Sequence, residues 1–179
     1  MSGVLTELLA LNSDRKPELM QTVAEILSHP HREICVETPL VDLEALSEPD
    51  TESFAELVMN PGTISPSRPH TPVHFEYEGR EFQFTHINDT RRHVSFDTYP
   101  NRFLRHFLSR YRQALCEVGD DAKESTQRLL GQIDTAISAL SEVSQVSRVS
   151  ADHNVLQKDP NYRQILLASI ALSKIDSSH

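Results

Sequence analysis

The spacing of apolar residues changes period twice along this chain, and this change constrains the fold most. Apolar residues recur at helical spacing over residues 4–27 and again from residue 103 onwards, whereas residues 73–84 alternate between apolar and polar. The alternation is interrupted at Glu78-Gly79, a pair suited to a tight turn between antiparallel strands. We therefore predict an α+β protein that is mostly helical, with a small antiparallel hairpin element around residues 73–96.

Helical segments are expected on both sides of this hairpin. The segment before it ends at His29-Pro30, because a proline disfavours helix in the residue before it. After it, Thr98 and Pro100 suit the start of a helix whose apolar face comprises Phe103, Leu104, Phe107, Leu108, Tyr111 and Leu115. A long helix over residues 121–148 and a last helix over residues 161–175, opened by Asp159-Pro160, should follow. The last helix is apolar nearly all round, which predicts that it is buried.

Charge and proline content divide the chain into three parts. Residues 1–59 form a helical, acidic region, because residues 33–67 carry eight acidic residues and no Lys or Arg. Residues 60–72 contain four prolines and are expected to be a Pro-rich linker. Residues 73–179 hold the hairpin and the long helices, and eight Arg and no Lys lie between residues 68 and 112.

The composition excludes several classes of protein. The 179 residues carry a formal net charge of −9, which argues against a general basic coat for nucleic acid but not against a local basic patch. No apolar run reaches the roughly 18 residues of a membrane span, and the N-terminus lacks the basic start of a secretory signal. The two cysteines form no disulfide framework. We expect a cytoplasmic protein without membrane contact.

Candidate catalytic and metal-binding groups are few. His29, His31 and Cys35 have spacings that metal ligands can adopt, but no fourth ligand lies nearby, so no metal site is predicted. Cys116 falls near an apolar helix face and is expected to be a buried structural thiol. The acid-x-Lys tripeptides at residues 14–16 and 121–123 stand at predicted helix starts, whereas nuclease carboxylates of this kind lie on strands. We predict no catalytic residue and no cofactor.

Arginine is the residue type that most suggests binding. Arg102, Arg105 and Arg112 are spaced by three and seven residues and share much of one helix flank. Arg suits bidentate contacts with phosphate or carboxylate better than Lys does. The predicted contacts to nucleic acid or a protein partner are Arg91, Arg92, Arg102, Arg105 and Arg112. The alternative is a solvated face, or pairing with the acidic residues 33–56.

Two segments resemble a known family. Residues 97–108 contain Asn101-Arg102-Phe103, preceded by Asn88-Asp89-Thr90-Arg91-Arg92, and residues 154–166 contain Val155-Leu156-Gln157 followed by Pro160-Asn161-Tyr162-Arg163. They resemble the region of unknown function that precedes the PD-(D/E)XK nuclease in McrC-like subunits of McrBC-type restriction systems. The resemblance covers roughly residues 73–172. The nuclease domain, with its catalytic Asp, Glu and Lys, has no counterpart here.

The resemblance implies a place in bacterial anti-phage defence. Relatives in that family work with an AAA+ motor and cut DNA. The chain is accordingly expected to be a non-catalytic adaptor that bridges an AAA+ motor subunit and DNA or a nuclease. A homo-oligomer is a further expected partner state. A metal-dependent nuclease or other hydrolase with an unrecognised site, and an inactive truncated remnant, are the alternatives.

Overall fold

The computed structural model describes residues 2–13, 18–42, 45, 59, 64–66, 74–118, 124–146, 150 and 152–177. The chain divides into two compact units, a helical unit formed by residues 1–33 and 95–179 and a β unit formed by residues 34–94. The β unit is thus an insertion between two parts of the helical unit. Six helices and several small antiparallel sheets among the described residues confirm the α+β class.

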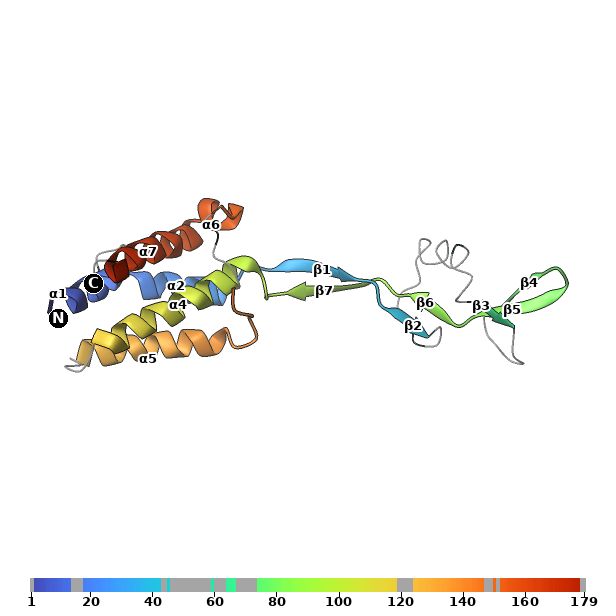
Figure 1. Ribbon diagram of the computed structural model, residues 1–179, viewed down its shortest axis with the longest axis horizontal. Coiled ribbons are helices and arrows are strands. Elements are labelled where there is room, and N and C mark those ends of the chain that lie inside the picture. Colours follow the sequence, from blue (N-terminus) through green and yellow to red (C-terminus); the bar gives the residue numbers. More distant parts are fainter. Residues whose placement is uncertain are drawn as a thin grey trace. The chain divides into compact units, whose positions relative to one another are not determined.

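The helical unit is built around the long helix α4 (Figure 1). Its described helices are α1 (Ser2–Ser13), α2 (Leu19–Ser28), α4 (Tyr99–Val118), α5 (Glu124–Ala139), α6 (Asn154–Lys158) and α7 (Pro160–Ser177). Helix α4 packs against α1, α5 and α7, and α2 packs against α5 and α7. None of the described helices is both long enough and apolar enough to cross a membrane.

The apolar face predicted for α4 is the centre of the core. Phe103, Phe107 and Tyr111 are each at most 1% exposed, which confirms the prediction. The Phe107 and Tyr111 rings stack with their centroids 5.8 Å apart. The Tyr111 hydroxyl donates a hydrogen bond of 2.6 Å to the carbonyl oxygen of Leu8, so even the polar atom of this ring is satisfied inside the core. The core therefore joins α1 and α4 by polar as well as apolar contact.

The region after α4 differs from its prediction in two respects. Helix α5 ends at Ala139, earlier than predicted, because the chain turns with short-range bonds such as that from the Val143 N–H to the Leu140 carbonyl. A further short helix, α6, lies between the two predicted helices, and the His153 side chain accepts a hydrogen bond from the Val155 N–H at its start. The start of α7 is as predicted, since one Asp159 carboxylate oxygen accepts bonds from the N–H groups of Asn161 and Tyr162.

Helix α7 is less buried than its composition predicts. Tyr162, Ile165, Ala168 and Leu172 face the core, but Leu167 and Ile170 on the opposite side are 49% and 45% exposed. The prediction of a helix buried all round was therefore wrong. The reason is geometric, because a helix at the edge of the bundle can turn only one side to its neighbours.

The β unit contains the predicted hairpin. Its strands β4 (His74–Tyr77) and β5 (Arg80–Phe84) are antiparallel, with Tyr77 opposite Arg80. The turn residues Glu78 and Gly79 have φ angles of 53° and 71°. Two successive positive φ angles match the tight turn that the sequence predicts, and glycine adopts such an angle without steric cost.

The partners of the remaining strands were not predicted. β1 (Glu33–Glu37) pairs with β7 (Arg91–Ser95), β2 (Leu40–Asp42) with β6 (His86–Asn88), and β3 (Ile64–Pro66) with β5. Residues 33–42, which sequence analysis placed in a helical region, are therefore mostly extended. β3 lies within the expected Pro-rich linker, whose other residues fall outside the described ones. Paired residues are 16 to 20 positions apart in sequence between β3 and β5, and 44 to 48 positions apart between β2 and β6.

Candidate functional site

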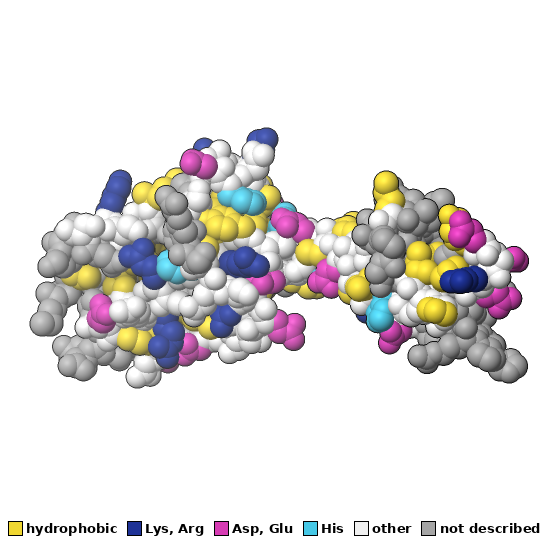
Figure 2. All heavy atoms as spheres, turned by 45° about the vertical axis from the view of Figure 1, so that its right-hand side comes forward, with side chains coloured by type: hydrophobic (Ala, Val, Ile, Leu, Met, Phe, Trp, Pro, Cys, Tyr) yellow, Lys and Arg dark blue, Asp and Glu magenta, His cyan; other side chains and the backbone are white. Residues whose placement is uncertain are grey.

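The solvent side of α4 is strongly basic. This helix carries four Arg, at positions 102, 105, 110 and 112, together with His106, and its one acidic residue is Glu117 near the end. Four positive charges against one negative contrast with the net charge of −9 of the whole chain. On the face shown in Figure 2, Lys and Arg side chains of the helical unit lie as separate groups among uncharged and acidic ones. Along α4 itself, the four Arg are two to five residues apart.

Arg102 is held at the start of α4 by a bidentate ion pair. Its Nε and Nη2 atoms donate to the two carboxylate oxygens of Asp97, each at 2.8 Å. The same oxygens accept bonds of 2.7 Å from the backbone N–H and the hydroxyl of Ser144. The Arg102 guanidinium, helped by Ser144, holds the pKa of the Asp97 carboxyl well below its usual range. Asp97 thus fixes the guanidinium and also ties α4 to the turn after α5.

The other Arg side chains of α4 are also oriented by neighbours. Arg105 donates through Nη1 to the Val143 carbonyl, and its buried Nε has no partner among the described residues. Arg110 donates to the Ser173 hydroxyl on α7 at 3.1 Å. Arg112 donates through Nε to Asp134 on α5. A guanidinium has five N–H donors, so donors of Arg102 and Arg112, whose side chains are 39% and 47% exposed, still face solvent.

A buried polar cluster at the start of α4, which we call the Asn101 cluster, was missed by sequence analysis. It comprises Asn101, Tyr162 and the backbone of His31 and Phe96. The Asn101 amide nitrogen donates to the carbonyls of His31 at 2.8 Å and Phe96 at 2.7 Å, and its oxygen accepts a bond from the Tyr162 hydroxyl. The His31 N–H donates in turn to Tyr162 at 3.1 Å. Every strong polar atom of the Asn101 side chain is therefore used.

The Asn101 cluster lies within the helical unit, close in sequence to the points where the chain enters and leaves the β unit. His31 comes shortly before β1 and Phe96 directly after β7, so one amide binds the backbone at both ends. Burial raises the pKa of Tyr162 to about 12, so its hydroxyl stays a neutral donor. A signal for this site existed, because Asn101 continues the apolar stripe of Leu104 and Leu108, and a polar residue in such a stripe needs partners.

Comparison with known proteins gives one match. The family described as a domain of unknown function, DUF2357, matches residues 3–168. The chain belongs to the DUF2357 family. No curated protein and no solved structure matches it. Asn101 and Tyr162, which come from the two segments singled out by resemblance, both lie within the DUF2357 match and contact each other.

The five Arg predicted to make contacts divide between the units of this DUF2357 protein. Arg102, Arg105 and Arg112 are on α4, whereas Arg91 and Arg92 are on β7 of the β unit. Arg91 donates to the fully buried Asp89 carboxylate at 2.7 Å. Arg92 is exposed and has no hydrogen bond or ion pair to any described residue. Contact with nucleic acid or a partner remains a prediction for all five.

Cysteine and metal chemistry find little support among the described residues. They contain no group of three or more His, Cys, Asp or Glu side chains that could hold a metal ion. Cys116 is exposed, so the expectation of a buried thiol was wrong; it lies on the flank of α4 next to Arg112 rather than on the Leu115 side. The two acid-x-Lys tripeptides, at residues 14–16 and 121–123, lie outside the described residues.

Proposed function

We propose that this DUF2357 chain is a non-catalytic interaction module of a McrBC-like bacterial anti-phage restriction system. In this role it bridges an AAA+ motor subunit and DNA or a nuclease. The observation that carries the proposal is the set of four Arg on α4, two of which are held in place by Asp97 and Asp134, on a chain with a net charge of −9. Such local charge suits a phosphate backbone while the rest of the surface repels it.

The ion pairs of α4 favour binding rather than preventing it. Asp97 and Asp134 each accept from one edge of a guanidinium and hold it in place, while the remaining N–H groups point elsewhere. A side chain that is already ordered loses less conformational entropy when it binds phosphate. The spaced arrangement suits successive phosphates better than a single buried anion.

The assignment to a restriction system is supported by the two resembling segments. Residues 97–108 and 154–166 supply the Asn101 cluster and the Asp97–Arg102 pair, which together shape the start of α4. The role as a bridge is inferred from the resemblance of these segments to McrC-like subunits.

DNA binding by the α4 face can be tested with one pair of matched variants. Arg112→Gln removes an α4 guanidinium, and the control Arg128→Gln removes an exposed cation from α5. Fluorescence anisotropy with a labelled duplex should show binding that weakens with salt, and Arg112→Gln should reduce the salt slope by about 1. Equal effects of both variants, or no binding at low salt, would contradict a specific role of α4.

The bridging role requires a second measurement. The chain should co-elute with the AAA+ subunit of its own restriction system, and DNA should join that complex only when α4 is intact. A chain that binds DNA but not the motor is not a bridge. Plasmid cleavage by the purified chain that depends on Mg²⁺ would instead favour the nuclease alternative.

A further inference from the structure

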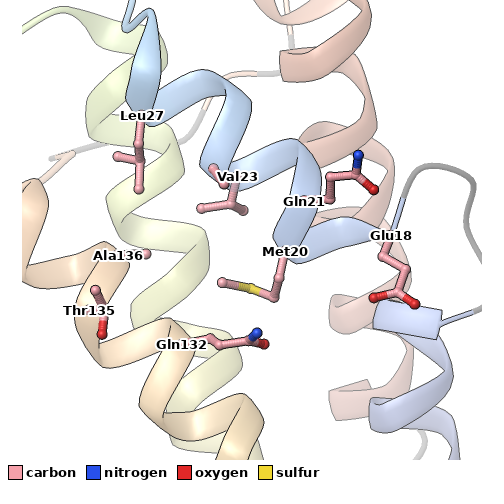
Figure 3. Close-up of a pocket in the computed structure, with 9 residues that line it drawn as sticks. Glu18, Met20, Gln21, Val23, Leu27, Gln132, Thr135 and Ala136 are labelled. Carbon is pink, nitrogen blue, oxygen red and sulfur yellow. The ribbon is translucent and has the colours of Figure 1, made fainter.

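An apolar groove runs between α2 and α5 of the helical unit (Figure 3). Its volume is about 420 Å³. Met20, Val23 and Leu27 of α2 form one wall, and Gln132, Thr135 and Ala136 of α5 form the other. The α2 residues are spaced by three and four positions, which is the spacing of a ridge that meets the side of another helix. The small side chains of Thr135 and Ala136 leave room for apolar side chains opposite that ridge.

One end of this groove carries a negative charge that has no partner among the residues the structure describes. Glu18 lines the groove and stands directly before α2. It occupies the position of a helix cap, but its side chain makes no capping bond. The carboxylate is exposed and has no hydrogen bond or ion pair to a residue that the structure describes. The groove therefore suits a ligand that combines apolar side chains with a cation at one end.

The exposed side of α7 has these properties. Arg163, Leu167, Ile170 and Lys174 are all exposed, and their spacing of four, three and four residues places them in one line along the helix. Leu167 and Ile170 are 49% and 45% exposed. We call these four residues the α7 stripe. It is an apolar pair with a cation at each end.

We infer that the α7 stripe of a second copy of this chain docks in the α2/α5 groove. Leu167 and Ile170 would then lie against Met20 and Leu27, and a cation of the stripe would reach Glu18. At 1.5 Å per residue, Arg163 lies about 6 Å along the helix axis from Leu167. Docking that brings the Arg163 end of the stripe to Glu18 would give the ion pair.

The same charges argue against two α7 stripes packing on each other. An antiparallel pair would bring Arg163 of one copy next to Lys174 of the other, and like charges at that distance repel. The groove-to-stripe contact uses two different surfaces, so each docked copy still offers a free groove or a free stripe. Such a contact is smaller than the roughly 800 Å² per partner of a standard interface, so we expect weak association that grows with protein concentration.

This association does not depend on binding of DNA or a motor, so it can be tested on the purified chain. Sedimentation equilibrium should give an average mass that rises above 20.3 kDa with concentration. Ala24→Arg blocks the groove at an exposed lining residue, and Leu167→Asp breaks the stripe. Each variant alone should remain monomeric at concentrations at which the natural chain associates, with an unchanged thermal midpoint.

Mixing the two variants is the decisive step. The Ala24→Arg chain keeps its stripe and the Leu167→Asp chain keeps its groove, so together they should form a 1:1 dimer that grows no further. A second check exchanges the charges of the groove and the stripe. The Glu18→Arg chain alone should associate at least tenfold more weakly than the natural chain. A mixture of the Glu18→Arg chain with the double variant Arg163→Glu, Lys174→Glu should regain most of the natural affinity.

Three results would overturn the inference. The natural chain could remain monomeric up to concentrations of order 1 mM, where contacts of about 4 kcal/mol become visible. The Ala24→Arg chain could associate as well as the natural one. The mixed variants could fail to form a dimer although each is folded, which would mean that groove and stripe serve other partners.

Discussion

The helical unit and the β unit differ in how many of their apolar side chains are buried. The helical unit buries 21 apolar residues in one cluster drawn from α1, α2, α4, α5, α6 and α7 and the turn after α5. In the described part of the β unit, Ile87 is the one large apolar side chain in the buried class, whereas Ile34, Val36, Leu40, Tyr77 and Val94 are at least half exposed. Stability should therefore be concentrated in the helical unit.

The β unit relies instead on its backbone ladders and a few polar contacts. Asp42 and His86 lie opposite each other on β2 and β6, with 3.1 Å between carboxylate and ring nitrogen. Glu37 and His93 are 3.9 Å apart across β1 and β7. Exposed pairs of this kind contribute little stability. Substitutions that remove side-chain packing should consequently have unequal effects in the two units.

The largest effect is expected for Phe107→Ala. The ring is 1% exposed and stacks on Tyr111, so its loss should leave a cavity and lower the free energy of unfolding by about 3–5 kcal/mol. Denaturant unfolding followed by helical circular dichroism measures this. Leu167→Ala, which removes a half-exposed side chain of the same unit, is the control and should cost far less. Equal losses in both variants would remove the contrast between core and surface.

The next effect should come from the Asn101 cluster. Tyr162→Phe removes one hydroxyl and leaves the Asn101 amide oxygen and the His31 N–H without partners. Unpaired buried polar groups should reduce stability by about 1–3 kcal/mol. Tyr99→Phe is a matched control, since the Tyr99 hydroxyl bonds the exposed Ser150 backbone. If the two variants have the same stability, the Asn101 cluster is accessible to water.

The predictable parts of this fold were those encoded locally. The α4 stripe, the cap at Asp159 and the Glu78-Gly79 turn each depend on residues within one or two turns of chain, and all three are confirmed. The pairing of β1 with β7 joins residues more than 50 positions apart and leaves no local pattern, because both faces of a two-stranded ribbon meet solvent. Alternation needs one buried face, and this ribbon has none.

The candidate site was predictable only in part. Arg spacing located the α4 face, but the acceptors of Arg102 and Arg112 come from Asp97 and Asp134, and only the folded bundle brings Asp134 to α4. Asn101 belongs to a segment that resembles McrC-like subunits, yet two of its three partners lie 61 and 70 residues away in sequence. Periodicity indicates which side of a helix is buried. It does not indicate which neighbour a polar side chain finds there.

A smaller effect is expected from pH through Asp97. Arg102 lowers the folded-state pKa of Asp97, so the carboxylate stabilises the fold above its unfolded pKa of about 3.9. This stabilisation is lost as the pH falls through that value towards the lower folded pKa. Asp97→Asn should cost about 1 kcal/mol at pH 7, since the pair is partly exposed, and should make unfolding less dependent on pH below 4. If the free energy of unfolding of Asp97→Asn falls with decreasing pH as steeply as that of the natural chain, other carboxylates control the acid dependence.

The smallest effect is expected on the β1/β7 ribbon. Glu37 and His93 share one face of it, so by alternation Ile34, Val36 and Val94 share the other, where they are 73%, 58% and 51% exposed. Ile34→Thr keeps a β-branched side chain and should change the stability of the ribbon by no more than about 0.5 kcal/mol, measured by hydrogen exchange of the β1 and β7 amides.

Ile87→Ala provides the matched comparison inside the β unit. The Ile87 side chain is fully buried, so its truncation should clearly increase the hydrogen-exchange rates of the β2 and β6 amides. Ile34→Thr should leave the exchange rates of the β1 amides nearly unchanged. If Ile34→Thr is instead as damaging as Ile87→Ala, something in solution covers the Ile34 face. The β unit would then not have an open apolar face in solution, and the contrast with the helical unit would describe only a single chain without neighbours.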